Sequence, residues 1–156
     1  DAMDDAIIQH IKRKYNLIIG PRTAEEIKIG IGSATSLDEE LIMTVKGRDL
    51  MGGLPRTIEV HSVEIREALW DPISTIVNAV RVTLEKTPPE LSGDIVERGI
   101  CMAGGSSQLR NLPKLIEREC GVPVYMCKNP ETAIVEGTGR TLESVEVMTK
   151  LEAAAK

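Results

Sequence analysis

The apolar stretch that runs into paired glycines at residues 100–112 constrains the fold more than any other part of the sequence. Residues 100–102 are apolar and predict a buried strand, and Gly104-Gly105, Ser106-Ser107 and an apolar pattern of helical spacing follow them. Consecutive glycines let the backbone approach a ligand, which is why such turns in α/β proteins often hold nucleotides. A tight connection would need the same residues, so both interpretations stay open. The motif is neither a Walker A loop nor a dinucleotide fingerprint, because the Gly-Lys-Ser/Thr of the first and the third glycine of the second are missing.

The chain from residue 72 onward predicts alternating helices and strands. Residues 72–86 carry the clearest helical pattern, with apolar side chains stepping by three and four. The elements expected after Thr87-Pro88-Pro89 are a short helix over 90–96, the strand at 100–102, a helix over 113–119, a strand over 122–126 and a last helix from Asn129-Pro130. This order is typical of an α/β domain whose parallel strands end at a ligand crevice.

The first part of the chain predicts helices beside an antiparallel pair of strands. A helix is expected over residues 2–15, with acidic residues early and basic residues late, as the helix dipole favours. A second helix is expected to begin at the N-cap Thr23, with Glu26 completing a capping box. Residues 39–48 and 56–63 are rich in β-branched side chains, and the loop between them predicts a hairpin.

A third helical segment is expected over residues 62–70. Ser62 is placed to cap it, and Glu64 and Glu67 fall on its exposed side. Asp71-Pro72 should end this helix and begin the next one, because proline favours the first helical turn.

Spacing alone gives few candidates for chemistry. Glu25 and Lys28 lie three residues apart on one helical face, which by itself favours a surface ion pair. His10 and His61 are the only histidines, and neither has the carboxylate neighbours of a metal ligand or a catalytic base.

Composition excludes several classes of function. The net charge of −5 and the scarcity of aromatic residues argue against a nucleic-acid partner. No run of apolar residues is long enough to insert directly into a membrane. The three cysteines form no Cys-x-x-Cys pair and lie in or beside apolar runs, so we expect buried, reduced thiols and no zinc site.

Five short segments form a distinctive set. They are DAMDDAI at 1–7, TAEEIK at 23–28, TPPEL at 87–91, GGSSQLRNL at 104–112 and NPETA at 129–133. In this order, over almost all of residues 1–149, they resemble the MreB family of bacterial actin homologues. That family belongs to the actin, Hsp70 and sugar-kinase ATPase superfamily, and the resemblance is to its C-terminal lobe only.

The resemblance implies an α/β fold, the second lobe of an actin-like (ribonuclease H-like) ATPase with a small α+β subdomain inserted. Residues 1–15 and 72–149 would form the large lower subdomain, and residues 16–71 the small upper one. Residues 150–156 predict a helical tail, and its last five residues match a designed helical spacer.

The resemblance also implies a nucleotide site on the adenosine side of a cleft between two lobes. The residues implied come from one helical turn and one glycine turn: Glu25, Glu26, Ile27 and Lys28, and Gly104, Gly105, Ser106 and Ser107. Glu25 and Lys28 would face the ribose and adenine, and the glycine turn would lie beneath the adenosine and its nearest phosphate. Ser106 stands where the family usually has a third glycine, and its Cβ would crowd the nucleotide unless φ there is negative.

The function implied is that of an ATP-binding, filament-forming cytoskeletal protein that determines cell shape, cytoplasmic and membrane-associated through the full-length parent or its partners. The parent would bind ATP with magnesium. Its partners would be further copies of itself through longitudinal contacts, a membrane-anchored adaptor and cell-wall synthesis proteins. The family's phosphate hairpins and catalytic carboxylate have no counterpart in these residues, so we expect no hydrolysis and weak or undetectable ATP binding from them alone.

Two other functions stay open. The chain could be a non-enzymatic docking module for a filament adaptor. It could also be a lobe of another superfamily ATPase, such as a chaperone or a plasmid-segregating relative.

Overall fold

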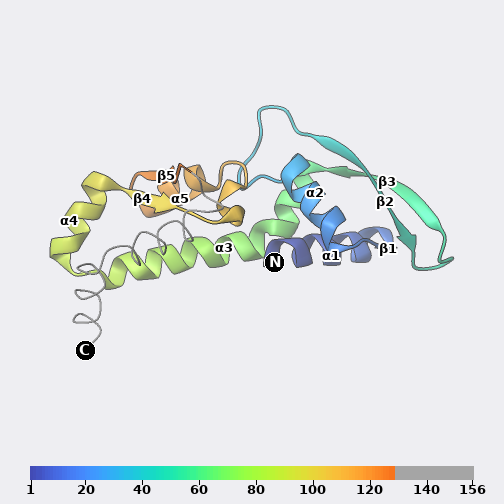
Figure 1. Cartoon of the computed structure of the whole chain (residues 1–156), viewed down its shortest axis with the longest axis horizontal. Coiled ribbons are helices and arrows are strands. Elements are labelled where there is room, and N and C mark those ends of the chain that lie inside the picture. The colour runs from blue at the N-terminus through green and yellow to red at the C-terminus, as the bar shows by residue number, and fades with distance from the viewer. Residues whose placement is uncertain (129–156) are drawn as a thin grey trace, which may run out of the picture.

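The computed structural model describes residues 1–128 and shows an elongated molecule in which one long helix, α3, connects two groups of elements (Figure 1). In chain order the elements are α1 (Ala2–Tyr15), β1 (Leu17–Ile18), α2 (Pro21–Ile31), β2 (Ile42–Asp49), β3 (Pro55–His61), α3 (Ser62–Lys86), α4 (Pro89–Arg98), β4 (Ile100–Met102), the 3-10 helix η1 (Gly105–Gln108), α5 (Leu112–Cys120) and β5 (Val124–Met126).

One group consists of α1, α2 and a three-stranded antiparallel sheet of order β1-β2-β3. The predicted hairpin is confirmed, with Met43 opposite Val60. The predicted first helix is also confirmed: the Asp1 side chain caps α1 by accepting from the Met3 N–H at 2.9 Å. Strand β1 was not predicted, because its two residues are too few to show a period.

Helix α2 begins earlier than the sequence predicted. Its N-cap is Gly20, and Pro21 occupies the first helical position, where a fixed φ suits the helix and no N–H is needed. Thr23 therefore lies inside the first turn, and the capping box with Glu26 is wrong. Glu26 instead accepts a hydrogen bond from Arg22 at 3.3 Å.

The helix break predicted at Asp71-Pro72 is wrong, because α3 is a single helix of 25 residues with Pro72 inside it. The apolar face continues through the proline, and Ile65, Leu69, Ile73 and Val77 are all buried along it. A proline inside a helix costs about 3 kcal/mol, whereas burial of each large aliphatic side chain contributes roughly 1.5–3 kcal/mol. Packing of one continuous face therefore outweighs the local signal to stop.

Two side chains at the start of α3 differ from their predicted roles. Ser62 does not cap the helix, since the N-cap is His61; its hydroxyl accepts from the Leu41 N–H at 2.8 Å and donates to the Glu40 carboxylate. Glu64, predicted to be exposed, is buried because groups on α1 bind its carboxylate, while Glu67 is exposed as predicted.

The second group contains α4, the parallel pair β4 and β5, and α5 (Figure 1). It confirms the predicted helix-strand-helix-strand order, and the predicted end of α5 at Gly121, where φ is +70°. Strand β4 is only half-buried, with Cys101 exposed. The helix predicted from Asn129 lies outside the described residues.

The prediction of three reduced cysteines is wrong for two of them. Cys101 on β4 and Cys127, which follows β5, form a disulfide with a Cα–Cα distance of 5.8 Å. The parallel pairing of the two strands brings them together across 26 positions of sequence. Cys120 is free and half-buried.

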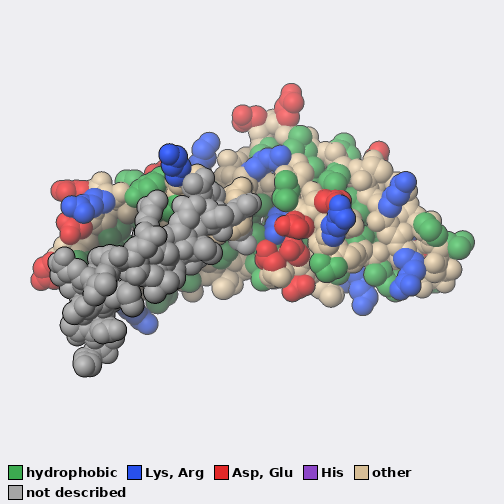
Figure 2. All heavy atoms as spheres, viewed as in Figure 1, with side chains coloured by type: hydrophobic (Ala, Val, Ile, Leu, Met, Phe, Trp, Pro, Cys, Tyr) green, Lys and Arg blue, Asp and Glu red, His purple; other side chains and the backbone are tan. Residues whose placement is uncertain are grey.

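A single apolar core joins both groups. Aliphatic side chains of α1, α2, the hairpin, α3 and α5 belong to one buried cluster, in which Ile7, Ile27, Ile65 and Leu115 are at most 1% exposed. Charged side chains lie outside this cluster, and on the face shown in Figure 2 acidic ones gather where the chain begins. No helix among residues 1–128 is long and apolar enough to cross a membrane.

Candidate functional site

Helix α2 presents two different faces because of its spacing. Ala24, Ile27 and Ile31 are buried against the core, and their steps of three and four residues place them on one side. Glu25 and Lys28 fall on a different side of the helix, where both line a cavity that Gly105 of the glycine turn also lines.

The glycine turn follows β4 directly. Gly104 has φ +89°, a conformation that residues with a Cβ rarely adopt, and η1 begins at Gly105. A Cβ added at Gly104 or Gly105 would meet no atom of the described residues within 4 Å. The backbone of this turn is therefore open to close approach by another molecule.

Helix α2 and the glycine turn both line one cavity of about 410 Å³. The residues that line it are Asp1, Glu25, Lys28, Ile29, Gly105, Gln108, Leu109 and Arg110. Pockets that bind small molecules usually measure about 300–1,000 Å³, so the cavity is large enough for part of a nucleotide.

Backbone and side-chain hydrogen bonds fix the two walls relative to each other. The Arg110 guanidinium donates to the Gly30 carbonyl at 2.8 Å, and the Ala34 N–H donates to the Arg110 carbonyl at 2.8 Å. Residues 80 apart in sequence are thereby joined at the end of α2. The two segments that line the cavity are therefore held in place by direct hydrogen bonds between them.

Lys28 carries the main positive charge of the α2 wall. Its ammonium lies 2.9 Å from an Asp1 carboxylate oxygen and 2.8 Å from one of Asp4, and its side chain is only 12% exposed. Its ion pairs therefore run to α1 and the residue before it, rather than to Glu25 as the spacing suggested. This pairing holds the Lys28 side chain in one direction at the cavity wall.

The eight residues predicted from the family resemblance fall into three groups. Glu25, Lys28 and Gly105 line the cavity, and Gly104 precedes it. Glu26 pairs with Arg22 at the surface, and Ile27 is fully buried, so neither lines the cavity. Ser106 and Ser107 belong to η1.

Six residues at or beside the cavity were not predicted: the apolar Ile29 and Leu109, and the polar Asp1, Asp4, Gln108 and Arg110. Gln108 and Arg110 lie within the glycine-turn motif, but helical or strand spacing gives them no distinct signal. Asp1 and Asp4 reach the site only because α1 packs beside α2, which no local pattern reports.

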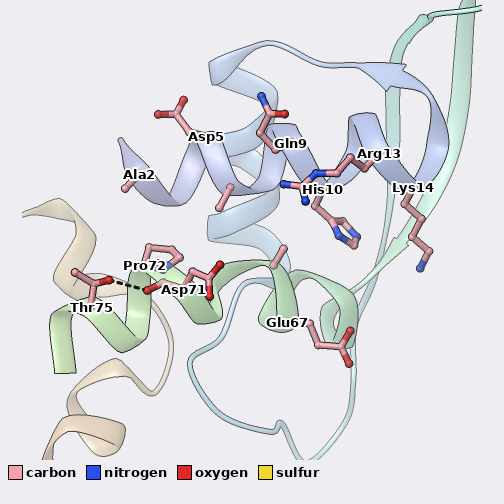
Figure 3. A pocket seen from close by; sticks show the side chains of 12 residues that line it. Ala2, Asp5, Gln9, His10, Arg13, Lys14, Glu67, Asp71, Pro72 and Thr75 are labelled. Carbon is pink, nitrogen blue, oxygen red and sulfur yellow. Dashed lines mark hydrogen bonds between the residues drawn. The ribbon is translucent and has the colours of Figure 1, made fainter. Parts of the chain in front are cut away.

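A second, larger hollow of about 710 Å³ lies between α1 and α3. Figure 3 shows Asp5 and Asp71 toward one end and Arg13 and Lys14 toward the other, with His10 on α1 and Glu67 on α3 nearer the second end. No cluster of three or more His, Cys, Asp or Glu residues able to hold a metal occurs within residues 1–128.

The fold is that of an α/β lobe of the actin-like class, in which helix α2 and a strand-glycine-helix turn line one cavity. Residues 1–150 match the MreB/Mbl protein family, so the chain belongs to that family. The resemblance found in the sequence is thereby confirmed.

Relatives of this chain have named roles. The chain is 46% identical over 147 residues to the cell shape-determining protein MreB of Escherichia coli (strain K12), covering 94% of this chain and 42% of that protein. It is 42% identical over 150 residues to the cell shape-determining protein Mbl of Bacillus subtilis (strain 168), covering 96% and 45%. The chain thus spans less than half the length of these relatives.

Solved structures share the fold. MreB5 of Spiroplasma citri bound to ADP matches with a TM-score of 0.86 and 35% identity, over 95% of this chain and 45% of that one. A MamK double helical filament matches with a TM-score of 0.76 at 19% identity, over 92% and 44%. At the lower identity the likeness concerns the fold alone.

Proposed function

We propose that this chain is the C-terminal lobe of an ATP-binding, filament-forming cytoskeletal protein that determines cell shape, and that the α2–glycine-turn cavity receives the adenosine side of the nucleotide. The observation that carries the proposal is that Glu25, Lys28 and Gly105, far apart in sequence, line one cavity. Relatives that determine cell shape, and one structure bound to ADP at 35% identity, support it.

The residues of the cavity suit a nucleoside. A carboxylate such as that of Glu25 accepts hydrogen bonds from ribose hydroxyls, and the open backbone at Gly105 allows N–H groups to approach a phosphate. Lys28 supplies a positive charge beside them. In the full-length protein, magnesium bound with ATP would neutralise phosphate charge. Glu26 and Ile27 would support α2 rather than touch the ligand.

The boundaries of two subdomains belong to this proposal. Residues 1–15 and 72–149 would form the large subdomain, and residues 16–71 the small one that carries Glu25 and Lys28. The cavity would then lie where the two subdomains meet, with the remaining walls supplied by parts of the full-length protein outside this chain.

Calorimetry of ADP binding to the full-length protein tests the nucleotide site. Loss of one charged hydrogen bond weakens binding by roughly 10- to 100-fold, so we expect at least that loss from Glu25→Ala or Lys28→Ala. Glu26→Ala and Arg22→Ala are matched controls, since they remove the same charges from the same helix outside the cavity. Unchanged affinity in the first pair would contradict the proposal.

Self-association is supported by the tip of the β2–β3 hairpin. Leu50, Met51 and Leu54 are 42%, 87% and 70% exposed there, and apolar groups so placed gain free energy when a further copy covers them. We expect Met51→Asp to abolish pelleting of filaments while ADP binding persists. Thr44→Asp, which adds the same charge on the same hairpin, should still pellet.

A second candidate function, docking of a membrane-anchored adaptor, is favoured by the α1–α3 groove (Figure 3). Its acidic and basic ends would orient an occupant of opposite polarity. Arg13→Glu should then release the adaptor from the full-length protein without changing ADP affinity. Retained adaptor binding in that variant would exclude the groove as the docking site.

A further inference from the structure

The disulfide lies on the outer face of the small parallel sheet. Cys101 is the central residue of β4 and pairs in register with Tyr125 of β5. Both are exposed, whereas the neighbouring Met102 and Val124 pack against the core. Side chains alternate between the two faces of a strand, so the Cys101 sulfur lies on the side that small reagents reach.

Cys127 is fixed beside Cys101 by the backbone. Its N–H donates to the Met102 carbonyl at 2.9 Å, which continues the β4–β5 pairing one residue past β5. The Cα–Cα distance of 5.8 Å is within the range that disulfides ordinarily span. The sheet therefore keeps the two sulfurs within reach of each other when the bond is open.

The third cysteine provides a contrast inside the same chain. Cys120 is half-buried on α5, and burial raises the pKa of its thiol. A thiol held in its protonated form is a poor nucleophile for disulfide exchange. Cys101 and Cys127 are thus distinguished from Cys120 by their pairing and by the exposure of Cys101, whereas Cys127 is half-buried like Cys120.

The position of the bond connects it to the candidate site. Strand β4 leads from Cys101 through Met102 into Gly104 and Gly105, where the cavity begins. The cross-link ties this strand end to the end of β5, so the turn starts from a fixed point when the bond is closed. With the bond open, that point is held only by the hydrogen bonds of a two-stranded sheet and by the packing of Met102 and Val124 against the core.

We propose that Cys101 and Cys127 are a reversible thiol–disulfide site, closed by a low-molecular-weight disulfide such as oxidised glutathione, that fixes the glycine turn when oxidised and loosens it when reduced. Its effect on nucleotide affinity rests on the function proposed above. The redox chemistry and its effect on stability do not.

The reaction balances as two exchanges. The Cys101 thiolate attacks one sulfur of oxidised glutathione, forming a mixed disulfide and displacing one glutathione thiolate. The Cys127 thiolate then attacks the Cys101 sulfur, closing the protein disulfide and displacing the second glutathione thiolate. Two electrons pass from the protein cysteines to glutathione, and the two thiol protons end on the two glutathione molecules.

Thiol mapping of the full-length protein tests the site. The protein is equilibrated in glutathione buffers from oxidised to reduced, alkylated, and mapped by peptide mass spectrometry. We expect residues 101 and 127 to be protected together in oxidised buffer, alkylated together in reduced buffer, and protected again on return, while Cys120 shows no such cycle. Alkylation of both thiols in every buffer, or failure to reclose, would overturn the proposal.

Thermal unfolding and ADP binding separate the two parts. The unfolding midpoint of the oxidised wild type should lie several degrees above that of the reduced form. The Cys120→Ser variant should show the same difference, and the midpoint of Cys101→Ser should not depend on the redox buffer. An unfolding midpoint of the wild type that is equal in oxidised and reduced buffer would overturn the stabilising role of the disulfide. ADP affinity should differ by severalfold between the two forms, and equal measurable affinities overturn the coupling to the turn. If neither form binds ADP while the mapping succeeds, the proposed nucleotide site fails and the redox site stands.

Discussion

Glu64 is the residue whose surroundings differ most from those of an ordinary helical glutamate. It is 6% exposed, and Tyr15 donates to its two carboxylate oxygens at 2.8 and 2.9 Å. Lys14 forms an ion pair with it. Burial alone would raise the pKa of the Glu64 carboxyl, but the hydrogen bonds from Lys14 and Tyr15 hold it below its usual value.

We expect Glu64→Gln to lower the free energy of unfolding by about 1–3 kcal/mol, because a buried, charge-assisted network loses its charge while Lys14 stays in place. Urea denaturation measures this. Glu67→Gln makes the same change at an exposed position of the same helix and should stay within about 0.5 kcal/mol of the wild type. Equal effects of the two substitutions would contradict the role of the network.

The sequence could not separate these two glutamates. Glu64 and Glu67 are three residues apart on one helix, and their spacing assigns them to the same face. What separates them is α1, whose Lys14 lies fifty positions earlier in the chain. A contact of that range leaves no mark on the local pattern around residue 64.

The lowered pKa of Glu40 leads to a prediction of how the free energy of unfolding depends on pH. Hydrogen bonds from Arg66 and then Ser62 lower the pKa of the Glu40 carboxyl from 4.5 to about 2. The unfolded chain therefore binds this proton more readily than the folded one, so the stabilisation is complete above the unfolded pKa and is lost as pH falls through the folded pKa. Urea midpoints between about pH 5 and pH 2 should fall less steeply in Glu40→Gln than in the wild type or in Glu39→Gln.

At the scale of elements, Pro72 marks a conflict between local signal and packing. Its missing N–H leaves one backbone hydrogen bond of α3 unmade, although the apolar face is buried on both sides of it. We expect Pro72→Ala to raise the free energy of unfolding by about 1–3 kcal/mol, the helix gain being partly offset by a more flexible unfolded chain. Pro89→Ala, at the first position of α4, should bring no such gain. A loss of stability in Pro72→Ala would contradict this account.

The elements that the sequence predicted correctly have signals of their own. The order of acidic and basic residues marks helix α1, and β-branched residues mark the hairpin. Glycine and proline mark the ends of the elements around the glycine turn. The predictions for the start of α2 and for the break at Pro72 were wrong because two local signals competed at each place. Pro21 at the first helical position decided the first, and the continuous buried face of α3 decided the second. The same limit applies to the cavity: Glu25 and Gly105 belong to motifs, whereas Asp1 reaches it through helix packing alone.

At the scale of the whole molecule, α3 gives the two groups of elements a shared core. Helix α1 and the hairpin lie beside its first part and α5 lies beside its middle (Figure 1), and the buried apolar side chains of α3 belong to one cluster with those of α1, the hairpin and α5. Ile11 of α1 and Ile116 of α5 are 0% and 1% exposed within the same cluster. We expect this continuous core to unfold in one step. The apolar side chains of both groups are covered by α3, so neither group keeps its core buried once α3 unfolds.

This continuity predicts a single unfolding transition. Ile11→Val and Ile116→Val should each lower the unfolding free energy by about 0.5–1.5 kcal/mol, since each removes one buried methylene group. Each should displace the whole curve, and together they should add within about 0.5 kcal/mol, because α1 and α5 each pack against α3 rather than closely against each other. Fluorescence of Trp70, the only tryptophan, reports from the first half of α3, and circular dichroism reports on all helices. Coincident curves from the two probes support one core, whereas a variant that shifts only one probe would show that the two groups unfold separately.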